Sequence, residues 1–172
     1  MQAVSSHAGN VRIAVRSGAR QAAAGTPPVP VPPSLPSGQE LADQLARPFL
    51  EMSAWPGAVQ CARHHTRQVL QETGLKDLIE PVELVVSEIV TNAIRACGLD
   101  RDATVRLWIA VTQDEVLVMV WDASPCTPLR QSPDPEAETG RGLLLVEAVS
   151  ASWGSFALAD EPGKVVWALC AS

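Results

Sequence analysis

Residues 83–97 read ELVVSEIVTNAIRAC and carry the strongest structural signal in the chain. At the helical step of about 100° per residue, the apolar residues of this stretch fall in one broad sector. These are Val85, Val86, Ile89, Val90, Ala93 and Ala96. Three polar residues, Glu88, Asn92 and Arg95, fall together in a narrow sector beside it. The pattern predicts a helix with one side in the core and a polar face that is a candidate site.

The polar face combines residue types that suit ion and proton chemistry. Glu88 and Asn92 are four residues apart, which on a helix places their Cβ atoms roughly 6 Å from each other. A carboxylate can act as a general base, and an amide oxygen can coordinate a hard cation. The alternative interpretation is a solvated polar stripe with a helical Glu/Arg pair. The spacing alone leaves both interpretations open.

Composition favours one soluble folded domain. The chain has 172 residues, of which 47% are hydrophobic and 19% charged, and no apolar run approaches the roughly 20 residues of a membrane span. Its four cysteines are scattered without a C-x-x-C pair, and its three histidines lack metal-ligand spacing. We therefore expect reduced thiols, no zinc site and a cytoplasmic location.

The amino-terminal segment differs from the remainder of the chain. The first 39 residues hold three arginines and no acid, so the net charge of −6 leaves −9 on the remainder. A folded part this acidic argues against direct binding of nucleic acid. Residues 26–38, TPPVPVPPSLPSG, read as an extended proline-rich linker. We predict a disordered tail over residues 1–46 and a folded domain over residues 47–172.

Periodicity within residues 47–172 predicts alternating helices and strands. Pro56 suits the start of a first helix that ends at Gly74, and Asp77 suits the cap of a second helix that ends near Gly98. A third helix is expected at 142–150, and strands at 49–52, 104–111, 116–121, 152–158 and 164–170, the last four as two hairpins. This order indicates an α+β fold, a two-layer sandwich of a mostly antiparallel sheet with helices on one face. The strands are apolar in both phases, so the second face is expected to meet the tail or another subunit.

A long loop separates the two hairpins. Residues 122–139 contain four prolines, which exclude a continuous helix or central strand, and loops of this length are often functional lids. The loop leads into Gly140, Arg141 and Gly142 immediately before the third predicted helix. Backbone N–H groups of the glycines and the Arg141 guanidinium could bind an anion at the positive end of that helix. The alternative is a flexible hinge followed by a helix start.

In this order, SEIVTNA on a helix, Asp122 at a strand end, a long loop, Gly-Arg-Gly-Leu at a helix start and a closing hairpin match one pattern. The chain resembles the ATP-binding domains shared by gyrase, histidine kinases and mismatch-repair ATPases, which have the Bergerat fold. It is most similar to the bacterial anti-sigma-factor serine/threonine kinases and to stand-alone ATP-binding regulators of actinobacteria. The resemblance covers roughly residues 47–170. No P-loop pattern competes with it.

The resemblance implies a role for each candidate residue. Glu88 corresponds to the general base of the family, and Asn92 to its magnesium ligand. Asp122 corresponds to the carboxylate that accepts a hydrogen bond from the adenine amino group. Arg95 corresponds to a basic residue near the nucleotide, and the segment Gly140, Arg141 and Gly142 to the phosphate-contacting end of the lid. ATP and Mg²⁺ are the implied cofactors.

The chain departs from the family pattern at two places. Many relatives place glycines after the adenine aspartate, whereas Asp122 is followed by Ala-Ser-Pro-Cys. The last family motif often has a threonine after a glycine, whereas Gly163 is followed by Lys164. The first departure affects the usual close approach of the backbone, and the second removes a hydroxyl group. Weak affinity for ATP is therefore expected.

Two classes of function follow from the resemblance. The first is an ATP- and Mg²⁺-dependent serine/threonine kinase that phosphorylates a small STAS-type anti-sigma antagonist and so switches partner choice. The second is a nucleotide-binding regulator that sequesters a sigma factor or another protein without phosphotransfer. A third, more remote reading is the detached catalytic domain of a histidine kinase. A homodimer is also expected, from the apolar sheet faces and from the kinases that the chain resembles.

Overall fold

The computed structural model describes residues 13–15, 43–45, 47–98, 100, 102–124, 142–158 and 161–171. In chain order the elements are β1 (Ile13–Val15), β2 (Leu50–Ser53), α2 (Ala58–Thr73), η1 (Lys76–Leu78), α3 (Ile79–Cys97), β3 (Thr104–Val111), β4 (Glu115–Asp122), α4 (Gly142–Val149), β5 (Ser152–Leu158) and β6 (Lys164–Ala171). The predicted helices, strands and hairpins are confirmed to within a few residues. The short strand β1 and the 3₁₀ turn η1 were not predicted.

The start of α3 differs from the sequence prediction. Asp77 was expected to cap this helix, but it lies inside η1, and the N-cap of α3 is Leu78, without a side-chain hydrogen bond. The reason is that η1 runs directly into α3, where the backbone N–H of Ile79 donates to the Lys76 carbonyl. The preceding turn therefore supplies part of the hydrogen bonding that a capping side chain would provide.

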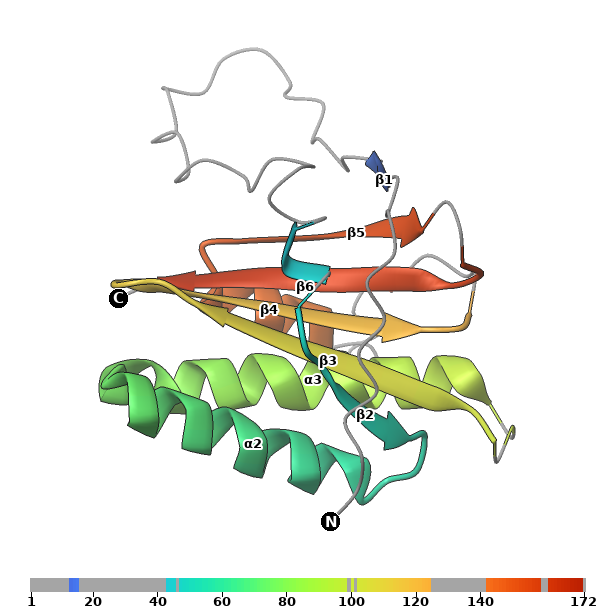
Figure 1. Ribbon diagram of the computed structural model, residues 1–172, viewed down its shortest axis with the longest axis horizontal. Coiled ribbons are helices and arrows are strands. Elements are labelled where there is room, and N and C mark those ends of the chain that lie inside the picture. The colour runs from blue at the N-terminus through green and yellow to red at the C-terminus, as the bar shows by residue number, and fades with distance from the viewer. Residues whose placement is uncertain are drawn as a thin grey trace.

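One six-stranded sheet forms the second layer of the fold. Its strand order is β1-β5-β6-β4-β3-β2, and every neighbouring pair is antiparallel. Helices α2 and α3 lie along one side of the sheet, α4 packs against α3, and β4 and β6 lie near the centre of the sheet (Figure 1). The predicted α+β sandwich is confirmed. In this arrangement the carboxyl end of β4 lies beside the amino end of β6, because Asp122 pairs with Lys164.

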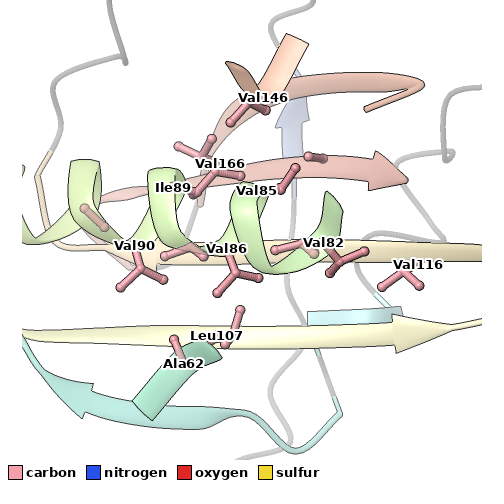
Figure 2. Close-up of a cluster of buried hydrophobic side chains, with 14 of the residues drawn as sticks. Ala62, Val82, Val85, Val86, Ile89, Val90, Leu107, Val116, Val146 and Val166 are labelled. Carbon is pink, nitrogen blue, oxygen red and sulfur yellow. The ribbon is translucent and has the colours of Figure 1, made fainter. Parts of the chain in front are cut away.

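The main core lies between α3 and the helix-bearing face of the sheet. Val86 and Val90 point toward Leu107 of β3, whereas Val85 and Ile89 point toward the side of β6 and α4 (Figure 2). Five of the six residues predicted for the apolar sector of α3 are buried. The sixth, Ala96, lies in the last turn of the helix and is exposed.

A buried carboxylate fastens α2 to α3. Glu83 is 4% exposed and accepts two hydrogen bonds from Arg67, at 2.6 and 2.8 Å, and one from Arg63 at 3.3 Å. The side chains of both arginines are about half exposed. The fork of the Arg67 guanidinium matches the two carboxylate oxygens, so this contact fixes the relative position of the two helices. That position matters because α3 carries the predicted site.

The opposite face of the sheet is also apolar, in agreement with the apolar residues in both phases of the strands. Its buried cluster includes Trp108, Met119, Trp121 and Trp167, and it also contains Leu45, from a segment that precedes β2. The helical residues 43–45 lie in front of β6 (Figure 1). The indole N–H of Trp108 donates to the Arg47 carbonyl at 3.3 Å. The chain's own residues just before β2 therefore cover part of this face.

Arg106 closes the same face near the end of β4. Its guanidinium lies 4.2 Å from the ring centre of Trp121 and 5.3 Å from that of Phe49. It also forms an ion pair with Glu161, in which the single nitrogen Nη1 donates to both carboxylate oxygens, at 2.7 and 3.0 Å. The cation–π contacts and this ion pair together hold the turn before β6 against β3.

The predicted boundary at residue 46 stays a prediction, because most of residues 1–46 lie outside the described residues. Within the described part of that segment, residues 13–15 pair with β5, and Leu45 is buried. No helix among the described residues is long and apolar enough to span a membrane.

Candidate functional site

The predicted polar face of α3 meets the start of α4. Glu88 and Asn92 are both partly buried, and Gly142 is the first residue of α4. A Cβ atom on Gly142 would collide with Oε2 of Glu88 and would lie 3.5 Å from Nδ2 of Asn92. Only a residue without a side chain allows the helix start to approach these two groups so closely. The structure therefore brings Glu88, Asn92 and Gly142 together.

The other residues predicted for this end of the site are Arg95, Gly140 and Arg141. Arg95 is exposed in the last turn of α3, one turn beyond Asn92. Gly140 and Arg141 lie outside the described residues. Of the predicted phosphate-contacting segment, the structure therefore describes only Gly142. This glycine lies against the polar face of α3.

Asp122 lies at the second end of the site, where β4 ends. Its side chain is almost fully buried, and Oδ1 accepts hydrogen bonds from Nζ of Lys164 at 2.7 Å and from the backbone N–H of Ser124 at 3.0 Å. Nζ of Lys164 also donates to the Ser124 carbonyl at 3.3 Å. Lys164 is buried as well. The two strands thus hold a buried ion pair at the point where Asp122 was predicted to meet a ligand.

One oxygen of this carboxylate is left over. Oδ2 of Asp122 is buried and has no hydrogen-bond partner in the described structure. Burial raises the pKa of the Asp122 carboxyl, and the Lys164 ammonium and the Ser124 N–H offset this effect only in part. An unsatisfied buried acceptor is costly in a folded protein. It is a suitable acceptor for a donor on a bound molecule.

Cys97 and Gly163 complete the surroundings of this pair. The Cys97 thiol interacts with the backbone of Ala123 and with the charges of Asp122 and Lys164, and burial raises its pKa. Gly163 has φ of 115°, and a Cβ atom there would collide with the Asp122 carbonyl. The turn before β6 therefore needs glycine to bring Lys164 against Asp122.

The two ends of the site are joined by one helix. Glu88 and Cys97 are nine positions apart on α3, which corresponds to about 14 Å along the helix axis. The Glu88 end offers a carboxylate, an amide and a helix N-terminus, whereas the Asp122 end offers a buried acceptor next to a donor. This separation suits an extended ligand with an anionic end and a hydrogen-bonding end.

The donor set fits a lightly held hard cation better than a closed metal site. Among the described residues, no three His, Cys, Asp or Glu side chains lie close enough to hold a metal ion. Mg²⁺ keeps several waters and needs few protein ligands when phosphate oxygens are present. The amide oxygen of Asn92 is the group at the Glu88 end that suits this role.

Sequence reasoning did not assign Lys164 or Cys97 to the site. Lys164 was noted only as a departure after Gly163, and its contact with Asp122 depends on the register between β4 and β6. These strands are not consecutive, so no turn between them fixes that register. The sequence signal that pointed to this place was the lysine following glycine at the start of a strand.

The fold and the two-ended site define a nucleotide-binding class of protein, and a family comparison agrees. The model of the family described as histidine kinase-like ATPase domain matches residues 52–169. The chain therefore belongs to the histidine kinase-like ATPase domain family, and this membership indicates ATP binding. A search among curated proteins found no match.

Proposed function

We propose that the protein is an ATP- and Mg²⁺-dependent serine/threonine kinase of the anti-sigma-factor type, which phosphorylates a small STAS-type antagonist and so switches partner choice. The observation that carries the proposal is Glu88, a partly buried carboxylate that contacts the start of α4 beside Asn92. A protein that only binds nucleotide does not need a base at this place. A kinase does, because a Ser or Thr hydroxyl must lose its proton during transfer.

Each residue has a defined task in this proposal. ATP supplies the phosphoryl group. The hydroxyl oxygen of the acceptor bonds to the γ-phosphorus as its bond to the β–γ bridging oxygen breaks, the hydroxyl proton passes to Glu88, and ADP leaves. Asn92 contributes an amide oxygen to Mg²⁺, and Oδ2 of Asp122 accepts from the adenine amino group. Backbone N–H groups at the start of α4 face the phosphates.

The second candidate function is a nucleotide-bound regulator that sequesters a sigma factor or another protein without phosphotransfer. The observations that favour it are the two departures from the family pattern, after Asp122 and after Gly163; the second of them brings Lys164 into an ion pair with Asp122. Both candidates share the nucleotide site. They differ in what happens to the γ-phosphoryl group.

The test of the kinase proposal uses purified protein, labelled ATP with Mg²⁺, and the candidate antagonist encoded nearby. Glu88→Gln should keep nucleotide affinity and reduce phosphotransfer by about 10²- to 10⁴-fold, because the amide keeps size and polarity but cannot take the proton. Glu80→Gln, at an exposed position in the first turn of the same helix, is the matched control and should transfer normally.

Asn92→Ala should behave differently from Glu88→Gln. It removes an oxygen ligand from the proposed coordination shell of Mg²⁺. The Mg²⁺-dependent affinity for nucleotide and the rate of phosphotransfer should therefore fall together. If the wild-type protein binds ATP and captures the antagonist but labels neither it nor a sigma factor, the kinase proposal is wrong and the regulator is favoured. Absence of ATP and ADP binding at millimolar ligand, with and without Mg²⁺, would contradict both candidates.

A further inference from the structure

We propose that Lys164 recognises the nucleobase. In this proposal its ammonium and the Asp122 carboxylate form hydrogen bonds with two neighbouring groups of adenine, the ring nitrogen N1 and the exocyclic amino group N6. Oδ2 of Asp122 accepts from the exocyclic N6–H, and Nζ of Lys164 donates to the ring nitrogen N1. This inference rests on the proposed nucleotide site and adds a specificity residue to it.

The geometry leaves one acceptor and one donor side by side. Oδ1 of Asp122 is used by Lys164 and by the Ser124 N–H, which leaves Oδ2 buried without a partner. Nζ of Lys164 donates to Oδ1 and to the Ser124 carbonyl, at 2.7 and 3.3 Å. An ammonium has three N–H groups, so one of them has no acceptor within the described part of the chain.

A purely structural ion pair accounts for these contacts less well. A carboxylate that only holds two strands together gains stability by satisfying both oxygens, since an orphaned buried oxygen costs free energy. Asp122 and Lys164 are opposite each other in the β4–β6 register, and both side chains are at least nine-tenths buried. The register thus fixes where the ammonium lies, while Oδ2 is kept free.

Lysine changes what the site accepts in comparison with threonine. A hydroxyl can donate or accept, so it tolerates either a bare ring nitrogen or a ring N–H on the ligand. An ammonium can only donate, so it requires an acceptor at that place. Adenine presents a donor, N6–H, next to an acceptor, N1. Guanine and hypoxanthine carry a hydrogen on N1 and would place a donor against the ammonium in the same orientation.

The wild-type protein can be tested with nucleotides that differ in single edge atoms. Titration calorimetry compares ATP with 1-deaza-ATP, which lacks the N1 acceptor, with purine riboside triphosphate, which lacks the amino group, and with GTP. We expect ATP to bind about 10- to 100-fold more tightly than 1-deaza-ATP, as for loss of a charge-assisted hydrogen bond. Equal affinities for ATP and 1-deaza-ATP, or tighter binding of GTP than of ATP, would overturn the proposal.

A variant links the discrimination to Lys164. Lys164→Met keeps the length of the side chain and removes the donor, so it should bind ATP and 1-deaza-ATP alike, whereas Lys76→Met, at an exposed position in η1, should discriminate as the wild type does. Retained discrimination in Lys164→Met would contradict the assignment. The Lys164→Met variant leaves the Asp122 charge unpaired and could fail to fold for that reason. The double variant Asp122→Asn/Lys164→Met removes this charge, and the same comparison of ATP with 1-deaza-ATP is then made with it.

The outcomes separate this inference from the proposed function. If no nucleotide binds to the wild-type protein, the proposed function fails, and the base-recognition role fails with it. If ATP binds without discrimination at N1, the nucleotide site stands, and only the role of Lys164 is wrong.

Discussion

At the residue scale, Gly142 decides how closely α4 can approach Glu88 and Asn92. A methyl group there would displace the end of the Glu88 side chain, which is flexible, so the fold can absorb the change. Alanine is also the better helix former by about 1 kcal/mol at interior positions. The glycine therefore serves the geometry of the site more than the stability of the helix.

We predict that Gly142→Ala leaves the melting temperature unchanged or slightly higher and reduces phosphotransfer by roughly 100-fold, because small displacements of catalytic groups have effects of this size. Leu144→Ala, at an exposed position on the same helix, is the control. Calorimetric melting and transfer of labelled phosphate measure the two effects. A large loss of thermal stability would show instead that the close approach of α4 to Glu88 stabilises the fold and does not serve the geometry of the site.

Gly163 and Gly74 form a matched pair for separating backbone strain from steric collision. Both have positive φ, at 115° and 85°, but a Cβ atom on Gly74 would meet nothing within 4 Å, whereas one on Gly163 would collide with the Asp122 carbonyl. Gly74→Ala should cost about 1 kcal/mol of unfolding free energy, and Gly163→Ala at least about 2 kcal/mol. Urea denaturation measures both, and equal costs would contradict the predicted collision.

Cys170 gives the fold a pH dependence in the alkaline range. Burial raises the pKa of this thiol from 9.0 to about 11. Below pH 9 the thiol is protonated in both the folded and the unfolded chain. Between about pH 9 and 11 only the unfolded chain releases the proton, so unfolding becomes more favourable by up to about 3 kcal/mol.

We predict that Cys170→Ala loses this part of the alkaline dependence, whereas Cys61→Ala, at an exposed thiol, keeps it. Urea denaturation at pH 8, 9.5 and 10.5 measures the difference between the two variants. Parallel stability curves for both variants across this range would show that the Cys170 thiol does not govern the alkaline loss.

At the element scale, the position of α3 depends on the contact between Glu83 and two arginines of α2. Glu83→Gln should lower the melting temperature by several degrees, because the buried side chain loses its charge-assisted bonds to Arg67 and Arg63. Glu80→Gln, at an exposed site on the same helix, should have little effect. Similar melting temperatures for the two variants would indicate that apolar packing alone holds the helices together.

Individual elements were predictable because their signals are local. The run of strand-forming residues predicted the bounds of β3, and the glycines at positions 74 and 98 marked the ends of α2 and α3. The start of α3 was missed because η1 runs into it and takes the place of a side-chain cap. The polar face of α3 was predictable from a spacing of four residues, which needs no tertiary information.

The contacts that join distant elements were not predictable from these local signals. The approach of Gly142 to Glu88 depends on how α4 crosses α3, and the Asp122–Lys164 pair depends on the register of two strands that are not consecutive. For Asp122 the resemblance to known ATP-binding domains implied a ligand, the adenine amino group, but no contact with another residue of the chain. The lysine could be recognised as a departure, whereas its contact with the carboxylate required the folded chain.

At the scale of the whole molecule, the second sheet face links the amino-terminal segment to the domain. Leu45 is 8% exposed within the cluster that holds Trp108, Met119 and Trp167. The disordered tail that the sequence predicts over residues 1–46 would not contribute to the stability of the domain. The burial of Leu45 now gives a reason to expect a cost, because truncation at that point would uncover apolar surface.

Two truncations that differ only in residues 41–46 test this expectation. The chain beginning at residue 41 keeps Leu45, and the chain beginning at residue 47 loses it. We predict that the shorter chain is less stable by about 2 kcal/mol, in the range for removing a buried leucine side chain, and that Leu45→Ala in the full chain has a similar effect. Urea denaturation measures the difference. Equal stability of the two truncated chains would show that Leu45 does not support the domain.

The same two chains also test the expected homodimer, which stays a prediction. If subunits associate through the second sheet face, the shorter chain, with more of its apolar residues uncovered, should associate more strongly than the longer one. Light scattering at tens of micromolar should then give a larger mass for the shorter chain. If both chains dimerise equally, the interface lies elsewhere, and monomers in both cases would contradict the dimer itself.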